Sequence, residues 1–392
     1  MSNDKNSQAP QPPFDNVQPV FQEITKKKRL RRRWLLFSAA VVVVVLVLLL
    51  ILMLTTTSLD GMKRFFRYLG DEPQPVSIGS YTDAALLDDN LLIANQNGAT
   101  LYDDAVLGSY QGLFSSPALC DSGEHALFYD IGGTHFALLN NKGETLYEKT
   151  TAAALYDADL SEDGTAAVLY AGTDSRAVLE VYTATGTLLY RRSSNTQYLN
   201  ACAVSPSASY AAVSTLGQEN IAYHGSVQLL RTDSEEVYAT ADMGAQLLYD
   251  LSFLTDDRLC AIGTDALVFF TAEGEILSQY TVTNGELLAY SFGGDGYVSA
   301  IYDLYSATNR YRLLLFSADG TVLAEADLPD APASLDSNGS YTAVLTDSTL
   351  FLYDQSLSLR SSTENSAYST ALARTDGTAY CLTDDEALLY IP

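Results

Sequence analysis

The sequence predicts an all-β protein, a β-propeller of about eight four-stranded blades, with an N-terminal transmembrane helix. Two patterns lead to this prediction: a polar turn that recurs at intervals of about 41 residues, and one long uncharged apolar stretch near the N-terminus. Composition agrees with a folded body, because the 392 residues include 26 Tyr and 14 Phe although the formal net charge is −26. So many aromatic residues exclude disorder over most of the length.

The apolar stretch runs from Trp34 to Leu54 and contains no charged residue. As a helix it would be about 31 Å long, which matches the hydrocarbon core of a bilayer. Its length, and the absence of a small-residue cleavage site in the TTTSLD that follows, favour an uncleaved anchor over a secretory signal peptide. We therefore predict a transmembrane helix at residues 34–54 in contact with membrane lipid.

A basic run immediately before the apolar stretch predicts its orientation. By the positive-inside rule the run places the N-terminus in the cytoplasm and the rest of the chain outside, as a single-pass protein of the cell membrane. Its members are Lys26, Lys27, Lys28, Arg29, Arg31, Arg32 and Arg33. We expect residues 1–33 to form a disordered cytoplasmic tail and residues 55–74 a stalk.

The parts of the sequence before and after the predicted anchor carry net charges of opposite sign. Residues 1–33 carry a net charge of about +5 and the remainder about −31. An acidic body without clustered Lys and Arg excludes a nucleic-acid partner, and the basic run is accounted for by the inner leaflet. We expect the acidic exterior part to attract cations or basic partners.

Eight polar turns repeat along residues 75–392 and define the blades. Each turn leads into a strand of small residues, then a more apolar strand, a second turn and an outer strand, which is the order of a four-stranded propeller blade. Seven blades would result if the first turn, which lacks Gly, were a false match. The turns are Asp88–Asn90, Asp121–Glu124, Ser161–Thr165, Ser205–Ser209, Thr255–Arg258, Gly293–Gly296, Asp336–Ser340 and Thr375–Thr378.

The last repeat ends at its third strand, ALLYI, and therefore lacks an outer strand. The strand-like segment at residues 75–81, PVSIGSY, precedes the first repeat and has no blade of its own. We predict that it completes the last blade, so that the two ends of the propeller share one sheet and the ring has no exposed edge between its first and last blades.

Catalytic, cofactor and metal sites need convergent side chains, and the sequence predicts none. It contains no nucleophile elbow, P-loop or dinucleotide fingerprint. Its histidines are His125, His135 and His224. Its cysteines, which have small or apolar neighbours and no metal-binding spacing, are predicted to be buried core thiols at Cys120, Cys202, Cys260 and Cys381.

Acidic residues also lack a catalytic pattern. Residues 157–164, DADLSEDG, resemble a calcium loop, but Glu162 stands where the tight turn needs Gly, so turn aspartates explain the stretch better. Neighbouring pairs such as Asp256 and Asp257 point to opposite faces of a strand or lie in turns, which disfavours glycosidase carboxylates.

Tyrosine recurs in the third and outer strands. We predict that these side chains pack between neighbouring blades with their hydroxyl groups near solvent. The residues are Tyr102, Tyr147, Tyr182, Tyr190, Tyr280 and Tyr353.

A candidate interaction patch lies on the longest loops between second and third strands, at residues 171–176, 215–227 and 303–311. In a propeller these loops share one face with the loops between blades, where a rigid ring supports binding residues. The patch is predicted to contain Arg176, Tyr223, His224, Tyr305 and Arg310. The alternative is that these are solvated loop residues.

The turns of SEDGT type, the strands of LFLYD type, the single anchor and the linker DGMKRFFRYLG resemble a family of uncharacterised Gram-positive bacterial membrane proteins. The resemblance implies an extracytoplasmic propeller similar to WD-repeat and quinoprotein-like domains. The chain departs from quinoprotein enzymes because its sole Trp, Trp34, lies at the membrane edge, and it lacks the WD dipeptide. No cofactor is therefore expected.

Two functions follow as expectations. The first is a non-enzymatic propeller that binds or scaffolds a protein or an envelope polymer outside the cell. The alternative is a hydrolase or lyase that acts on cell-wall or other glycans through carboxylates in the central channel.

Overall fold

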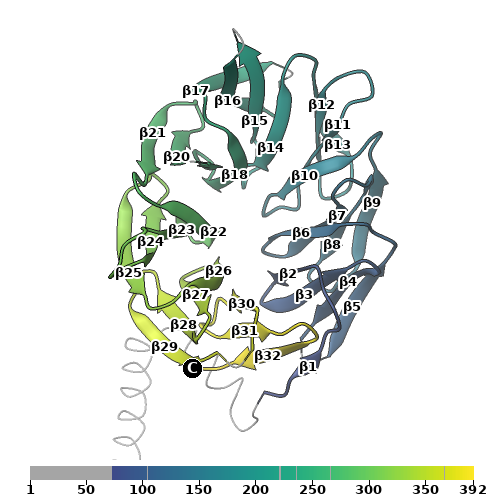
Figure 1. The fold of residues 1–392 in the computed structure, drawn as a ribbon. Coiled ribbons are helices and arrows are strands. Elements are labelled where there is room, and N and C mark those ends of the chain that lie inside the picture. Colours follow the sequence, from purple (N-terminus) through teal and green to yellow (C-terminus); the bar gives the residue numbers. More distant parts are fainter. Residues whose placement is uncertain (1–72, 104, 220–221, 235, 265, 366) are drawn as a thin grey trace, which may run out of the picture. The chain divides into compact units, whose positions relative to one another are not determined.

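The computed structural model describes residues 73–392 except 104, 220–221, 235, 265 and 366. These residues form eight four-stranded antiparallel sheets arranged as a ring (Figure 1). The predicted eight-bladed propeller is confirmed, and the first turn is a true repeat. Within this part of the chain, no helix is long and apolar enough to cross a bilayer. The predicted tail, the span at residues 34–54 and the stalk up to residue 72 lie outside the described residues.

Every blade has an inner strand next to the ring axis, two middle strands and an outer strand. The inner strands of blades 1 to 8 are β2 (Asp83–Leu87), β6 (Pro117–Ser122), β10 (Leu155–Leu160), β14 (Tyr198–Val204), β18 (Leu248–Thr255), β22 (Glu286–Gly294), β26 (Pro332–Asn338) and β30 (Thr370–Ala373). The second strands are β3 (Asn90–Asn95), β7 (His125–Asp130), β11 (Ala166–Ala171), β15 (Tyr210–Glu219), β19 (Arg258–Gly263), β23 (Tyr297–Asp303), β27 (Tyr341–Thr346) and β31 (Ala379–Leu382). The third strands are β4 (Gly98–Tyr102), β8 (His135–Asn140), β12 (Ala177–Tyr182), β16 (Ala222–Arg231), β20 (Ala266–Thr271), β24 (Tyr311–Ser317), β28 (Thr349–Asp354) and β32 (Glu386–Tyr390). The outer strands are β5 (Val106–Gln111), β9 (Thr145–Thr150), β13 (Leu188–Ser194), β17 (Val237–Gly244), β21 (Ile276–Thr281), β25 (Val322–Leu328), β29 (Leu359–Glu364) and, in blade 8, β1 (Val76–Ser77).

The core lies between blades rather than within one layer. Middle strands such as β11 and β12 are buried along nearly their whole length, because neighbouring blades cover both faces of each sheet. Small residues allow this close approach. Outer strands such as β9 and β21 alternate between exposed and half-buried positions. All four cysteines have free thiols, and they are buried as predicted except for the half-buried Cys120.

The predicted tyrosines pack between blades, but two of their hydroxyl groups are not near solvent. Tyr147 contacts Phe136 of its own blade, and Phe136 in turn contacts Tyr182 of the next blade. The hydroxyl oxygens of Tyr147 and Tyr190 are buried, so the solvent prediction is wrong for them. At Tyr147 the reason is that the turn at Gly186 of the next blade lies directly against the ring.

Closure of the ring uses the segment that precedes the first repeat. β1 pairs antiparallel with β32, with Val76 opposite Ala387 and Ser77 opposite Glu386. Prolines at positions 73 and 75 have no N–H to donate to a sheet, which explains why this outer strand begins no earlier than Val76. The N-terminal and C-terminal ends of the described chain thus share the sheet of blade 8.

A second contact joins blade 8 to blade 1. The guanidinium of Arg374, which is 1% exposed, donates from Nε to the carbonyl oxygen of Asp89 at 2.9 Å. The backbone N–H of Thr375 donates to Asp89 Oδ1 at 2.8 Å, and its hydroxyl donates to the same carboxylate. Asp88 and Asp89 have φ values of 51° and 61°, a left-handed pair that forms the first turn without Gly. Asp89 therefore supplies both a turn and a closure contact.

Turn glycines at blade contacts are expected to tolerate substitution less well than turn glycines in open space. Gly320 (φ +79°) lies where an added Cβ would be 2.5 Å from the ring of Phe269, whereas Gly296 (φ +67°) has nothing within 4 Å. Gly296→Ala should cost about 1 kcal/mol through backbone strain alone, and Gly320→Ala about 2–3 kcal/mol because the ring must also move. Urea unfolding of the two variants measures the difference; equal losses would contradict the packing argument.

Candidate functional site

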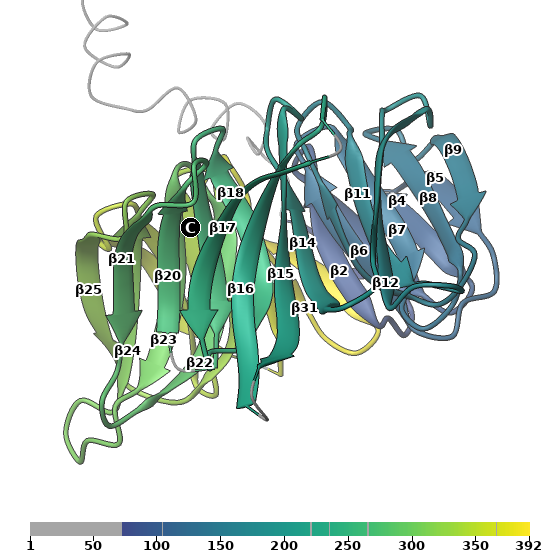
Figure 2. The same ribbon diagram turned by 90° about the horizontal axis from the view of Figure 1, so that it is seen from above.

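The two ends of the ring differ in the connections they carry. One end, the turn face, holds the turns between first and second strands and between third and outer strands. The other, the loop face, holds the loops between second and third strands and the loops between blades. The long hairpin of β15 and β16 projects from the loop face, at the lower side of Figure 2. Variable loops on a rigid ring are the usual place for binding residues.

Blade 6 supplies two residues of the predicted patch, and both donate hydrogen bonds to Asp303. The guanidinium of Arg310 donates to Asp303 Oδ2 at 2.7 Å from Nη2 and 2.8 Å from Nε. The backbone N–H of Tyr305 donates to Asp303 Oδ1 at 2.8 Å. Tyr305 has φ 50°, unusual for a bulky residue, and its side chain is 59% exposed. The buried carboxylate thus holds an aromatic ring and an arginine together at the surface.

The other predicted residues lie in blades 3 and 4. Arg176 lies over the ring of Tyr198 at 4.7 Å, which joins the loop of blade 3 to the start of the inner strand of blade 4. His224 Nε2 is 3.1 Å from Asp242 Oδ1 on the neighbouring strand β17. Tyr223 is 72% exposed. The structure therefore brings Tyr305 and Arg310 together, and it places Arg176 and His224 in other blades against different partners.

The loop face also carries exposed apolar residues that the sequence prediction missed. Tyr198, Tyr249 and Leu288 stand near the beginning of their inner strands, and Leu113 and Ile131 lie in loops of the same end. Each is more than one-third exposed. No local sequence pattern separates these positions from buried strand residues, since the inner strands also begin with apolar residues that are buried, such as Leu155 and Leu199.

A β-bulge occurs at the same place in five consecutive inner strands. In blades 3 to 7 the pairing of the inner strand with the second strand skips one residue close to the loop face, whereas the inner strands of blades 1, 2 and 8 pair without a skip. Bulges redirect side chains and are common beside functional sites. The skipped residues are Tyr156, Asn200, Tyr249, Leu288 and Ala333.

Carboxylates of the inner strands bind the backbone of the next blade. Asp157 and Asp159 of β10 accept hydrogen bonds from the backbone N–H groups of Cys202 and Val204 of β14, at 2.7 and 2.8 Å. Asp336 accepts from Ala373 in the same way at 2.8 Å. An inner strand is the edge of its sheet and has N–H groups without sheet partners. These carboxylates accept hydrogen bonds from such N–H groups.

The same arrangement makes the inner carboxyls hard to ionise. Burial raises the pKa of Asp157 to about 8, and the neighbouring Asp250 and Asp159 add to the effect. Burial likewise raises the pKa of Asp159 and Asp336 to about 7. The pKa of Asp250 is also raised by burial, although its carboxylate accepts a 2.7 Å hydrogen bond from the hydroxyl of Tyr290.

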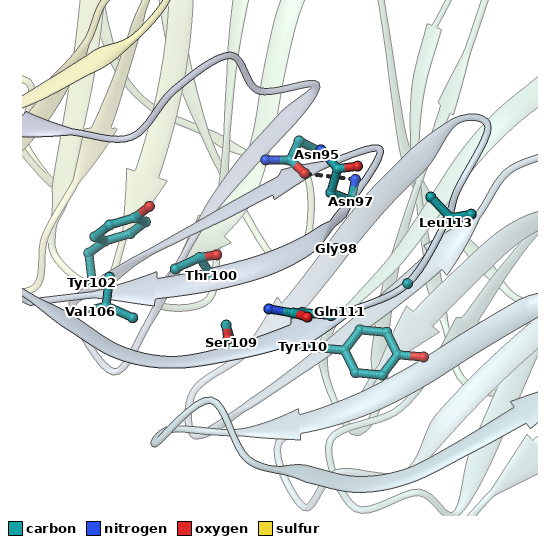
Figure 3. Close-up of a pocket in the computed structure, with 11 residues that line it drawn as sticks. Asn95, Asn97, Gly98, Thr100, Tyr102, Val106, Ser109, Tyr110, Gln111 and Leu113 are labelled. Carbon is teal, nitrogen blue, oxygen red and sulfur yellow. Dashed lines mark hydrogen bonds between the residues drawn. The ribbon is translucent and has the colours of Figure 1, made fainter.

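A polar groove of about 800 Å³ lies on the outer part of blade 1 (Figure 3). Its labelled residues lie along β4 and β5, at the end of β3 and in the loops that follow β3 and β5. Asn95 accepts a hydrogen bond from the backbone N–H of Asn97 at 2.8 Å. The labelled side chains do not converge on one point as those of a catalytic site would. Among the described residues no group of three His, Cys, Asp or Glu side chains is placed to hold a metal ion.

These features define the chain as an eight-bladed β-propeller with an aromatic loop face. It belongs to the family of unknown function DUF5711, whose model matches residues 73–389. The crystal structure of the C-terminal WD40 domain of Sif2 is similar, with a TM-score of 0.59, 14% identity and coverage of 82% of this chain and 99% of that chain. BamB from Moraxella catarrhalis is similar with a TM-score of 0.51, 13% identity and the same coverage. A comparison with curated proteins finds no match.

Both solved structures support the expected likeness to WD-repeat and quinoprotein-like propellers. At these identities the likeness concerns the fold alone.

Proposed function

We propose that this chain is a membrane-tethered, extracytoplasmic propeller of the Gram-positive envelope that acts as a non-enzymatic binding or scaffolding module. Its partner is a protein or an envelope polymer, which it holds through the loop face. The observation that carries the proposal is the group of exposed tyrosines there, Tyr198, Tyr223, Tyr249 and Tyr305. Tyrosine and arginine supply most of the binding energy at many protein interfaces, because they bury a large area with few rotatable bonds.

The tether rests on the sequence. The uncharged stretch at residues 34–54 and the basic residues before it predict a single crossing with the propeller outside. A binding module on such an anchor stays near the membrane, where its effective concentration toward other envelope components is high.

Photo-crosslinking in the native membrane tests the proposal. A benzoylphenylalanine at position 223 or 305, on the loop face, is expected to give reproducible cross-linked products. The same group at Glu124, an exposed position on the turn face, is expected to give few or none. The double change Tyr198→Ser and Tyr249→Ser should lower the yield from position 223 at least fivefold. Equal products from both faces, or none, would contradict a loop-face module.

The alternative, a glycan hydrolase or lyase, is favoured by one specific observation. Asp157 has a near-neutral pKa and a second carboxyl, Asp250, close by, and a general acid works best when its pKa is near the operating pH. Release of reducing ends from purified cell wall by the wild type, lost in Asp157→Asn while wall binding remains, would establish this function. Wall binding without release supports the binding module.

A further inference from the structure

We propose that the loop-face end of the ring axis contains a binding site for an alkylammonium or guanidinium group, presented by a lysine or arginine side chain of a protein partner. The site, called the axial cation site, consists of Tyr156, Asp157, Asn200, Tyr249, Asp250 and Tyr290. This inference adds the chemistry of the partner to the proposed function. It rests on the proposed function in one respect, namely that the partner is a protein.

Three of these residues are bulge residues of consecutive blades. Tyr156, Asn200 and Tyr249 occupy the skipped position in β10, β14 and β18, so neighbouring strands present them at one level of the axis. Tyr249 is 43% exposed and Tyr156 and Asn200 are partly exposed, so solvent reaches this level. The repeated bulge sets these three residues at equivalent positions of neighbouring inner strands, and the ring of Tyr156 also packs against the core between blades 3 and 4.

Carboxylates lie among the aromatic rings. Asp157 and Asp250 directly follow the bulge residues Tyr156 and Tyr249, and the pKa of Asp157 is raised mainly by burial and in part by the charge of Asp250. The ring of Tyr290 lies 6.4 Å from that of Tyr249, centroid to centroid, and its hydroxyl donates to Asp250. Aromatic rings interleaved with carboxylates are the chemistry that recognises organic cations, through cation–π attraction and charge-assisted hydrogen bonds.

One polar atom of the site, Nδ2 of Asn200, is buried without a hydrogen-bond partner in the structure. Nδ2 is a donor, and buried donors are normally paired. A peptide supplies what the site lacks: a cationic side chain for the carboxylates, and a carbonyl oxygen for this donor.

Burial raises the pKa of Asp157 and Asp250, and a bound cation would favour the ionised form of both carboxyls, so binding would release protons. The strongly acidic exterior part of the chain also steers cationic ligands toward the ring.

Small-molecule probes test the site directly. The full chain in maltoside micelles, which contain no choline headgroups, is titrated with acetyl-lysine methylamide, acetyl-arginine methylamide and acetyl-norleucine methylamide by calorimetry and saturation-transfer NMR. The two cationic probes are expected to bind at least tenfold more tightly than the norleucine probe. Asp250→Asn should reduce their affinity at least tenfold, and Tyr249→Ala about fivefold.

Asp336→Asn is the matched control. Asp336 is also an inner-strand aspartate that accepts an N–H from the next blade, but it lies in blade 7, outside the site. Its change should leave probe binding within twofold. Equal binding of the lysine and norleucine probes, or equal losses in Asp250→Asn and Asp336→Asn, would overturn the inference.

The result of the probe titration can be distinguished from the result of the loop-face cross-linking. Cross-links that persist at full yield in Asp250→Asn, together with no probe preference, reject the axial cation site and leave the binding module intact. Probe binding that depends on Asp250, in a protein that gives no loop-face cross-links, supports the site and rejects the module as proposed.

Discussion

Arg374→Ala is expected to lower the free energy of unfolding by about 3–5 kcal/mol, the range for removing one partner from a buried charge pair. The guanidinium is almost fully buried, bonds the Asp89 carbonyl across the ring closure, and lies 3.7 Å from the buried carboxylate of Asp376. It also lies over the ring of Tyr380, 5.4 Å from the centroid. Alanine would leave a carboxylate without its cation, an acceptor without its donor and a cavity. Urea unfolding followed by circular dichroism measures the loss.

An arginine ion pair at the surface provides the control. Arg360 and Asp354 of blade 7 form a 2.8 Å contact, and the Arg360 side chain is 60% exposed. Arg360→Ala should cost less than about 1 kcal/mol, since solvent screens exposed pairs. If the two alanine variants lose similar free energy of unfolding, the contact of Arg374 across the ring closure contributes no more than a surface ion pair. The pairing of β1 must then close the ring alone.

The blades could be predicted from sequence because their signal is local. Turn residues recur at a fixed interval, and each turn needs particular side chains whatever its tertiary surroundings. The first turn has no Gly, and the structure shows how it forms nevertheless: Asp88 and Asp89 themselves adopt the left-handed conformation. Counting strands predicts the outer strand of the last blade but not its length, which is two residues in the structure and begins directly after Pro75.

The axial site could not be predicted in the same way. Its bulges recur in the backbone, but the bulge residues are of different kinds, such as Tyr156, Asn200 and Leu288, so no residue pattern repeats. Asp157 was grouped with turn aspartates because it stands just before SEDG. The overlooked signal was the spacing of Asp157 and Asp159: residues two apart on a strand share a face, and two carboxyls on one face of an inner strand are unusual.

The predicted patch divides in the structure. The prediction of a long loop at residues 215–227 is wrong, because most of these residues are paired in the hairpin of β15 and β16. Asp303 gathers Tyr305 and Arg310 on one loop, while Arg176 stacks on Tyr198, a residue that the sequence prediction did not single out. Contacts between blades depend on how far each loop reaches over its neighbour, which the residues of one loop do not determine.

Asp157→Asn is expected to stabilise the propeller most at pH 8 to 9, less at pH 5, and not at all below pH 4. The folded state raises the pKa of this carboxyl to about 8, mainly through burial, against about 3.9 in the unfolded chain. The folded protein therefore holds a proton that the unfolded chain releases, so the stability is fully present below pH 4 and is lost as pH rises toward 8. Asparagine retains an acceptor for the Cys202 N–H and cannot ionise. Because solvent at the axis screens part of the effect, we expect a gain of about 1–3 kcal/mol at pH 8.5.

Asp163→Asn should show the opposite sign and serves as the control. Although burial acts to raise the pKa of Asp163, hydrogen bonds from Ser161 and Thr165 lower it overall, so its contribution is present above pH 4 and lost on acidification. The test is the free energy of unfolding of wild type and both variants at half-unit steps from pH 5 to 9. A wild type whose stability rises with pH through this range, or an Asp157→Asn variant with an unchanged slope, would mean that Asp157 is ionised in the folded protein.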